Sequence, residues 1–228
     1  LPVYKIGESA GLMFYVMPYV DGQTLSEIAA LPDKDRSYSS IATIVYQTAL
    51  ALDHAHESGI FHRDVKPSNI MLDRHGHVWL LDFGLASLDE QLDLTQTGEI
   101  IGTLRYMSPE RLAPKTVRTL DRRLDVYSLG ATLYELLSGL PPYHDISKPA
   151  LNKAIQETQP TSVKQLAPTS PLALIRICEK AMEREPNDRY ANCLEMGEDL
   201  QRFLSGQEVE ARPLSRATRI ARYVRHHS

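Results

Sequence analysis

The sequence predicts an α+β fold that is mainly helical, with a small strand-containing edge. Apolar residues recur every three or four positions over residues 38–58, the pattern of one face of an amphipathic helix. A strongly apolar helix fits residues 125–138, because Gly139 and two prolines follow and would end it. The strand patterns are short, and they lie at residues 3–6, 12–17, 70–72 and 78–81.

The remaining elements follow from turn residues and periodicity. A turn at residues 7–11 separates the first two strands, and residues 23–30 suit a short helix. The later two strand patterns form a hairpin around residues 73–76. Residues 85–110 show little periodicity, so we expect a long functional loop there. Further helices are expected over residues 149–157, 171–184 and 191–204.

Composition indicates an ordinary globular protein of one or two domains. The 228 residues are 43% hydrophobic and 24% charged. Two cysteines, Cys178 and Cys193, are too few for a disulfide framework and lack neighbours at metal-ligand spacing, so we expect reduced thiols. No apolar run approaches the roughly 18 residues that span a bilayer. A cytoplasmic location is therefore expected.

The net charge of −4 is unevenly distributed along the chain. Residues 212–228 contain five arginines and no acidic residue, so the rest of the chain carries a formal charge of −9. Apolar residues within this basic tail have the spacing of one helix face. Weak attraction to an anionic membrane is one expectation, and packing on the chain's own acidic body is another. Nucleic-acid binding is disfavoured, because the body is acidic and no groove-reading motif is present.

Two short strings contain the residue types that phosphoryl transfer requires. Residues 62–69 read His-Arg-Asp-Val-Lys-Pro-Ser-Asn, and residues 82–84 read Asp-Phe-Gly. One such residue alone would indicate only a solvated loop. Here both strings occur in the right order, and the two strand patterns of a hairpin join them, as the structural context of the motif demands.

Each polar residue of these strings suits one chemical role. Asp64 can accept a hydrogen bond from a hydroxyl substrate and act as catalytic base. Lys66 can neutralise the charge that develops on a transferring phosphoryl group. Asn69 and Asp82 offer a carbonyl and a carboxylate oxygen, which are hard ligands suited to Mg²⁺.

These strings resemble the catalytic half of a protein kinase, specifically the eukaryotic-like serine/threonine kinases of bacteria. The resemblance covers almost the whole chain and implies ATP and Mg²⁺ as cofactors and protein serines and threonines as substrates. It implies a partial kinase domain over residues 1–206, in which residues 1–17 end the N-terminal lobe and residues 18–206 form the hinge and the C-terminal lobe. Residues 207–228 are then a basic tail.

The resemblance also places the adenine ring. Met17 matches the gatekeeper, and the backbone around Tyr19 and Val20 would hydrogen-bond adenine. Met71 would form the floor beneath the ring. An ordinary strand end remains the alternative for Met17, since a lone methionine is more often core filler.

Outside the two strings, the resemblance assigns a substrate-seating segment, residues 102–110. Within it, Thr103 would hydrogen-bond near Asp64 and Lys66. The other assignments are structural, and they concern Glu110 paired with Arg189, Asp125 bound to the backbone of the loop at residues 62–63, and Phe83 of the Asp-Phe-Gly string.

A basic residue before the catalytic aspartate is typical of kinases that phosphorylation activates. That residue is Arg63, and Thr95 and Thr97 occupy the matching activation segment. A phosphate on either threonine would order the segment by pairing with an arginine. Autophosphorylation, with self-association to perform it, is therefore expected; simple loop threonines are the alternative.

Parts of a complete kinase have no counterpart in residues 1–228. No glycine-rich loop precedes Met17, and Lys5 lies only 12 positions before it, too few for the missing strands and helix. The favoured explanation is a portion of a normal kinase; the alternative is a catalytically silent module that binds partners. In either case we expect residues 1–228 alone to transfer phosphate weakly or not at all.

Overall fold

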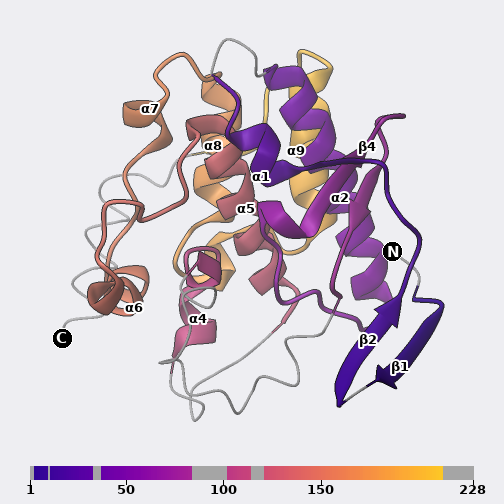
Figure 1. Cartoon of the computed structure of the whole chain (residues 1–228). Coiled ribbons are helices and arrows are strands. Elements are labelled where there is room, and N and C mark those ends of the chain that lie inside the picture. The colour runs from indigo at the N-terminus through magenta and orange to yellow at the C-terminus, as the bar shows by residue number, and fades with distance from the viewer. Residues whose placement is uncertain (1–2, 10, 33–36, 84–101, 114–120, 213–228) are drawn as a thin grey trace.

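Helices account for about half of the described residues, and the strands lie at one edge (Figure 1). The computed structural model describes residues 3–9, 11–32, 37–83, 102–113 and 121–212. The strands are β1 (Lys5–Ser9), β2 (Leu12–Val16), β3 (Gly22–Thr24), β4 (Ile70–Asp73) and β5 (Val78–Leu80). The longer helices are α2 (Tyr38–Glu57), α5 (Arg123–Ser138), α6 (Lys148–Glu157), α8 (Leu172–Ala181) and α9 (Cys193–Leu204). Shorter helices are α1 (Leu25–Ala29), η2 (Pro67–Asn69), α4 (Pro109–Leu112), α7 (Val163–Leu166) and η5 (Pro186–Asp188). The mainly helical α+β fold is thus confirmed.

The β1–β2 hairpin projects from the helical body (Figure 1). Its two strands are antiparallel, and Ser9 pairs with Leu12. The turn expected at residues 7–11 is therefore too long, because β1 continues to Ser9. Gly11 takes the left-handed backbone that so tight a connection needs, with φ of 78°.

A second sheet has the order β3–β4–β5 and contains the expected hairpin. Strand β3 corrects the prediction of a helix over residues 23–30, because residues 22–24 are extended and the helix begins only at Leu25. Thr24 caps that helix: its side chain accepts from the Glu27 amide, and the Glu27 carboxylate accepts from the Thr24 amide at 2.7 Å. Thr24 also pairs with Met71 of β4.

Helix α2 forms where the amphipathic pattern predicted it. Its apolar face is buried, whereas the opposite face is polar and exposed. The helix ends at Glu57, and Gly59, two residues later, has a left-handed φ of 75°. The Gly59 amide donates to the His56 carbonyl and the Ile60 amide to the Ala55 carbonyl, which is the Schellman arrangement.

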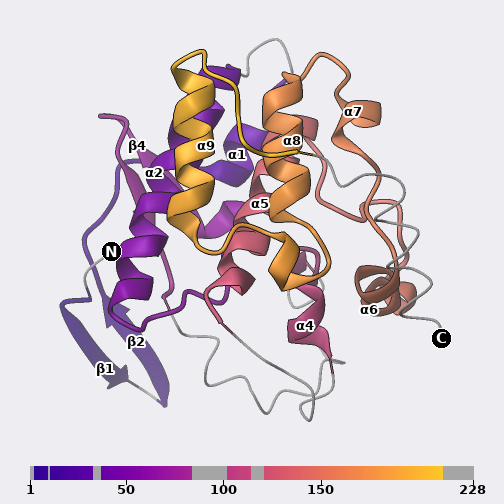
Figure 2. The same cartoon turned by 180° about the vertical axis from the view of Figure 1, so that it is seen from behind.

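Helix α5 lies at the centre of the molecule, with α2 and α8 packed against it (Figures 1 and 2). It is buried on almost all sides, and Gly139 ends it with φ of 74°, as the sequence predicted. Four of its leucines join the main core, together with Leu52 of α2, Leu174 of α8 and Leu200 of α9. The helix is therefore a rigid element to which loops can be fastened.

The segment after α9, assigned above to the tail, folds back on that helix. Val209 and Ala211 are buried in the main core. The buried Asp199 carboxylate accepts the amides of Glu210 at 2.7 Å and Ala211 at 2.9 Å, and the Tyr190 hydroxyl at 2.8 Å. The buried charge of Asp199 is thus satisfied by hydrogen bonds, and those from Glu210 and Ala211 fix the position of the segment that follows α9.

Some expectations fall on residues outside the described ranges. Thr95 and Thr97 lie there, as does the amphipathic pattern of residues 217–224. Of the loop expected at residues 85–110, the described part includes the start of α4. No helix of the described residues combines the length and apolarity needed to cross a bilayer.

Leu133→Ala should lower the free energy of unfolding by about 2–5 kcal/mol, because it leaves a cavity in the core. Leu133 is fully buried in α5. Urea denaturation followed by circular dichroism measures the change. The matched control is Leu172→Ala on α8, since Leu172 is 52% exposed and should change stability by at most about 0.5 kcal/mol. Equal losses in the two variants would contradict the central place of α5.

Candidate active site

The loop of residues 62–69 brings its three chemical groups into one cluster. The Lys66 ammonium lies 2.9 Å from the Asp64 carboxylate. The Asn69 amide nitrogen donates to the same carboxylate and to the Asp64 carbonyl, both at 2.9 Å. The side chains of Asp64 and Lys66 remain about one-fifth exposed. The carboxylate is thus held by two donors and is still accessible from solvent.

Thr103 joins this cluster from the substrate-seating segment. The Lys66 ammonium donates to the Thr103 hydroxyl at 2.8 Å. Lys66 therefore lies between the carboxylate of Asp64 and a residue 37 positions later. This contact fastens one end of the segment beside the candidate catalytic base.

The β4–β5 hairpin carries Asp82 back to Asn69. Ile70 pairs with Leu80, and the Leu81 amide donates to the Asn69 carbonyl at 2.9 Å. Asp82 then takes a left-handed backbone, with φ of 57°, and its side chain is exposed. Such a conformation is uncommon for a residue other than glycine and often marks a functional position.

The side-chain oxygens of Asn69 and Asp82 are of a kind that suits Mg²⁺. Because the Asn69 nitrogen is turned to Asp64, its carbonyl oxygen is left as the group that could bind a cation. Asp82 adds a carboxylate close by along the chain. An amide and a carboxylate oxygen are ligands that Mg²⁺ accepts, with water and phosphate oxygens completing its shell.

His62 and Phe83 connect the two strings through their rings. The ring centroids are 4.6 Å apart. His62 is fully buried, and this desolvation lowers its pKa below the ordinary value, outweighing the opposite effect of Asp125 and Asp64. Phe83 therefore packs against the first residue of the loop at residues 62–69, where burial disfavours the charged imidazole.

The Asp125 carboxylate holds the backbone of the loop at residues 62–69, called the catalytic loop below. It accepts the amides of His62 and Arg63, each at 2.8 Å. Arg63 has a left-handed φ of 66°, which these bonds help to maintain. Asp125 is fully buried in the first turn of α5, where the helix dipole favours a negative charge. The contact expected from the sequence is present.

His56 is a site residue that the sequence reasoning missed. Its Nε2 lies 2.8 Å from the Asp125 carboxylate, and both side chains are fully buried. The residue stands at the end of α2, on the apolar face of that helix. A polar residue at a buried helix position was the available signal, but its partner 69 positions later could not be identified from spacing.

Contacts to α5 position the middle of the substrate-seating segment. The Tyr106 hydroxyl donates to the Glu135 carboxylate, and Ser128 donates to the Tyr106 carbonyl at 2.8 Å. Burial raises the pKa of Glu135 and also that of the Tyr106 hydroxyl. The segment is therefore attached to the rigid centre of the molecule by its side chain and its backbone.

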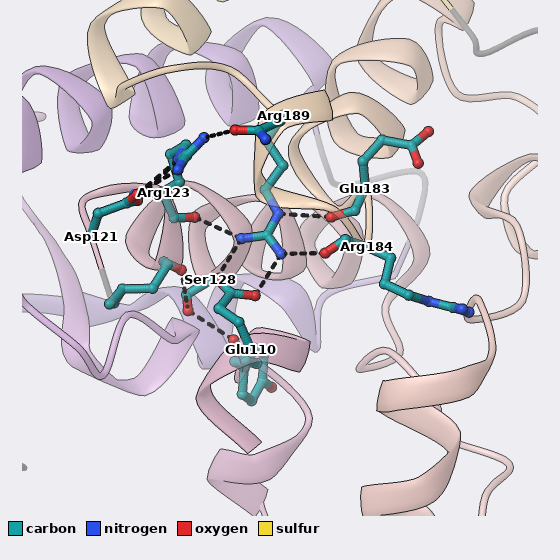
Figure 3. Close-up of polar contacts among 10 residues, drawn as sticks. Glu110, Asp121, Arg123, Ser128, Glu183, Arg184 and Arg189 are labelled. Carbon is teal, nitrogen blue, oxygen red and sulfur yellow. Dashed lines mark hydrogen bonds and ion pairs between the residues drawn. The ribbon is translucent and has the colours of Figure 1, made fainter. Parts of the chain in front are cut away.

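Glu110 and Arg189 form the ion pair expected at the end of this segment (Figure 3). Both guanidinium Nη atoms donate to the carboxylate at 2.7 Å, in a bidentate arrangement. Carbonyls of Arg123, Glu183 and Arg184 accept the other donors of Arg189. The Arg189 side chain is fully buried, so its charge is compensated entirely by protein groups.

A second arginine continues this network, and the sequence reasoning did not find it. Arg123 donates to both carboxylate oxygens of Asp121 (Figure 3). It also donates to the Asn187 side chain at 2.6 Å. These bonds lower the pKa of Asp121. The start of α5 is thereby joined to η5, beside Arg189.

The candidate adenine residues lie along the chain leading into β3. Met17 is 39% exposed and Tyr19 is 90% exposed, while Val20 is half-buried. Met71 lies on β4, paired with Thr24 of β3. The pairing of β3 with β4 therefore connects the expected hinge to the expected floor of the adenine site.

Arg189→Met should lower the free energy of unfolding by about 3–5 kcal/mol, since it leaves the Glu110 carboxylate without its partner. Lys153→Met is the matched control. Lys153 pairs with Glu157 at 3.8 Å on the surface, with 76% of its side chain exposed, so its loss should cost at most about 0.5 kcal/mol. Chemical denaturation measures both values; an Arg189→Met cost as small as the control's would refute the structural role of the pair.

The lowered pKa of His62 predicts that stability decreases in mild acid. The unfolded chain binds a proton near pH 6.5, whereas the folded protein resists protonation to a lower pH. The contribution of His62 to the free energy of unfolding is therefore complete above pH 6.5. It is lost as the pH falls through the pKa that His62 has in the folded protein. His62→Gln should flatten the fall in the free energy of unfolding between pH 7.5 and 5.5, whereas His54→Gln, with a side chain 86% exposed, should not. Identical slopes for wild type and His62→Gln would contradict this origin.

Comparison with known proteins agrees with this geometry. The model of the protein kinase domain matches residues 2–200. The serine/threonine-protein kinase PknB of Mycobacterium leprae is 39% identical over 214 residues, which are 92% of this chain and 34% of that protein. A probable serine/threonine-protein kinase of Corynebacterium efficiens is 40% identical over 194 residues, covering 82% of this chain and 29% of the relative.

A probable serine/threonine-protein kinase of Streptomyces coelicolor is 36% identical over 218 residues, covering 92% of this chain and 31% of the relative. The chain thus spans about a third of the length of the curated relatives it matches. Both the domain model and the relatives agree with the resemblance drawn from the two strings. The chain belongs to the protein kinase family, in its bacterial, eukaryotic-like serine/threonine type.

Proposed function

We propose that this chain is the catalytic lobe of a kinase that transfers the γ-phosphoryl group of MgATP to serine and threonine hydroxyls of proteins. The observation that carries the proposal is the cluster of Asp64, Lys66, Asn69 and Thr103, joined by hydrogen bonds and an ion pair of 2.8–2.9 Å. Its members come from the catalytic loop and from the substrate-seating segment. The γ-phosphoryl group of MgATP and the hydroxyl of the protein substrate would therefore meet there.

Asp64 acts on the acceptor hydroxyl. Its carboxylate accepts the hydroxyl hydrogen bond and orients the oxygen for in-line attack, and it takes the proton as the new bond forms. Asn69 supports this role because its amide holds the carboxylate in one orientation. The partial exposure of Asp64 leaves room for a substrate side chain to approach.

Lys66 acts on the phosphoryl group. Its ammonium is shared between Asp64 and Thr103 and would contact the equatorial oxygens of the transferring group. When bound, Mg²⁺ neutralises phosphate charge, and Asn69 and Asp82 are the residues that would hold it. Met17, Tyr19, Val20 and Met71 would surround the adenine ring.

Other features of the function are proposals at the same level. We propose a cytoplasmic location. We also propose that a second copy of the kinase phosphorylates Thr95 or Thr97, because Arg63 directly precedes Asp64 and could pair with the phosphate. Residues 1–228 contain no glycine-rich loop before Met17, so we propose that these residues alone transfer phosphate weakly or not at all. Assays of the function therefore need the full-length natural protein.

Asp64→Asn in the full-length protein should reduce phosphate incorporation into a generic basic protein by about 10²–10⁴-fold, the usual contribution of a positioned acid–base group. Thermal stabilisation by MgATP should persist, because Asp64 is not an expected nucleotide ligand. Glu157→Gln, which neutralises an exposed carboxylate on α6, is the matched control and should leave both signals unchanged.

The outcomes separate the enzyme from a silent binding module. Incorporation that depends on Asp64, together with stabilisation by MgATP, supports the kinase. Wild-type protein that gives neither signal supports the module. Full activity in Asp64→Asn would contradict the assigned role of the carboxylate.

A further inference from the structure

Arg105 of the substrate-seating segment has an unusual set of partners. Its guanidinium donates to three backbone carbonyls of one loop: Pro142 at 3.3 Å, Tyr143, and Ile146 at 3.4 Å. This loop joins α5 to α6 and is called the α5–α6 loop below (residues 139–147). A single side chain thus collects carbonyls that would otherwise need separate donors.

The loop held in this way contains a strained residue. Tyr143 has φ of 56°, a left-handed conformation that is an outlier for a bulky residue. Its side chain is buried, and its hydroxyl donates to the Thr158 carbonyl at 3.1 Å. Strain of this kind persists only where the surroundings determine it, and the Arg105 contacts are part of those surroundings.

Apolar packing joins the same two segments. Leu104, beside Arg105, packs with Tyr143 and with Leu151 and Ile155 of α6 in a small core separate from the main one. Met107 and Ile146 cover its border. The substrate-seating segment and the α5–α6 loop therefore form one body, in which Arg105 supplies the polar contacts.

The substrate-seating segment also contacts the candidate catalytic residues, through Thr103, two positions before Arg105. Thr103 accepts from Lys66, whose ammonium lies 2.9 Å from Asp64. The Thr103 carbonyl also accepts the Tyr106 amide at 3.1 Å, so the backbone between Thr103 and Tyr106 forms one turn. Arg105 lies within this turn, where a shift of its backbone would displace the Thr103 hydroxyl.

We propose that Arg105 is a positioning residue, which fastens the turn of residues 103–106 to the strained α5–α6 loop and so sets where Thr103 meets Lys66. The proposal rests on the kinase function only for its kinetic consequence. Arginine suits this role because its planar guanidinium presents several donors in a fixed fork. A lysine ammonium could not address three spread carbonyls with the same geometry.

Hydrogen exchange tests the coupling without any need for activity. Arg105→Gln should speed amide exchange by about tenfold or more in two peptides, one covering residues 142–148 and the other covering residues 102–108. The second contains the Tyr106 and Met107 amides, which are bonded within the turn. Exchange in α2 should not change. Faster exchange in the loop peptide alone would overturn the proposal.

Kinetics of the full-length protein give the second test. Arg105→Gln should raise the KM for the protein substrate and lower kcat, together by about tenfold in kcat/KM, while the KM for ATP stays unchanged. A smaller properly folded fraction would lower kcat alone. Arg105→Lys should recover little of the loss, because one ammonium replaces the fork.

A double-mutant cycle identifies the route of the effect. If Arg105 acts through Thr103, Arg105→Gln should have a much smaller effect in a Thr103→Val background. Additive effects would overturn the proposed route. The matched control is Arg74→Gln, which removes an exposed arginine paired with Asp21 at 3.0 Å and should change neither exchange nor kinetics. Inactive wild-type protein would refute the proposed function, while hydrogen exchange would still decide the role of Arg105.

Discussion

The geometry of the candidate site depends on one buried carboxylate, that of Asp125. It binds two successive amides of the catalytic loop and the His56 ring, and it lies in the first turn of the most buried helix. The left-handed Arg63 immediately precedes Asp64. A strained backbone needs a rigid support, and α5 supplies it because its surroundings are close-packed. The packed core thus fixes the position of the candidate catalytic base, Asp64.

The same principle explains the other buried charges. Arg189 donates to three carbonyls besides its partner Glu110, and Asp199 accepts two amides and a tyrosine hydroxyl. Burying a charge is costly unless hydrogen bonds satisfy it, and here the backbone of neighbouring loops supplies most of those bonds. The hydrogen bonds that make burial of each charge possible therefore also fix a loop against a helix.

The sequence predicted the parts of this structure that depend on local pattern. The long helices, the β4–β5 hairpin and the polar cluster of the catalytic loop belong to this group, because periodicity, glycine positions and motif order are local. Strand β3, the partner of His56 and the carbonyls bound by Arg105 could not be predicted. Each depends on a residue more than 30 positions away, and only tertiary packing brings the two together.

The substrate-seating segment lies between two supports of different kinds. On one side, Tyr106 is bonded to Glu135 and Ser128 of the rigid central helix. On the other, Arg105 is bonded to a loop that contains a strained residue. A packed helix has one arrangement, whereas a strained loop can relax into another if its contacts are lost. Movement of the segment should therefore originate at the α5–α6 loop, and Thr103 is the residue through which Lys66 would respond to it.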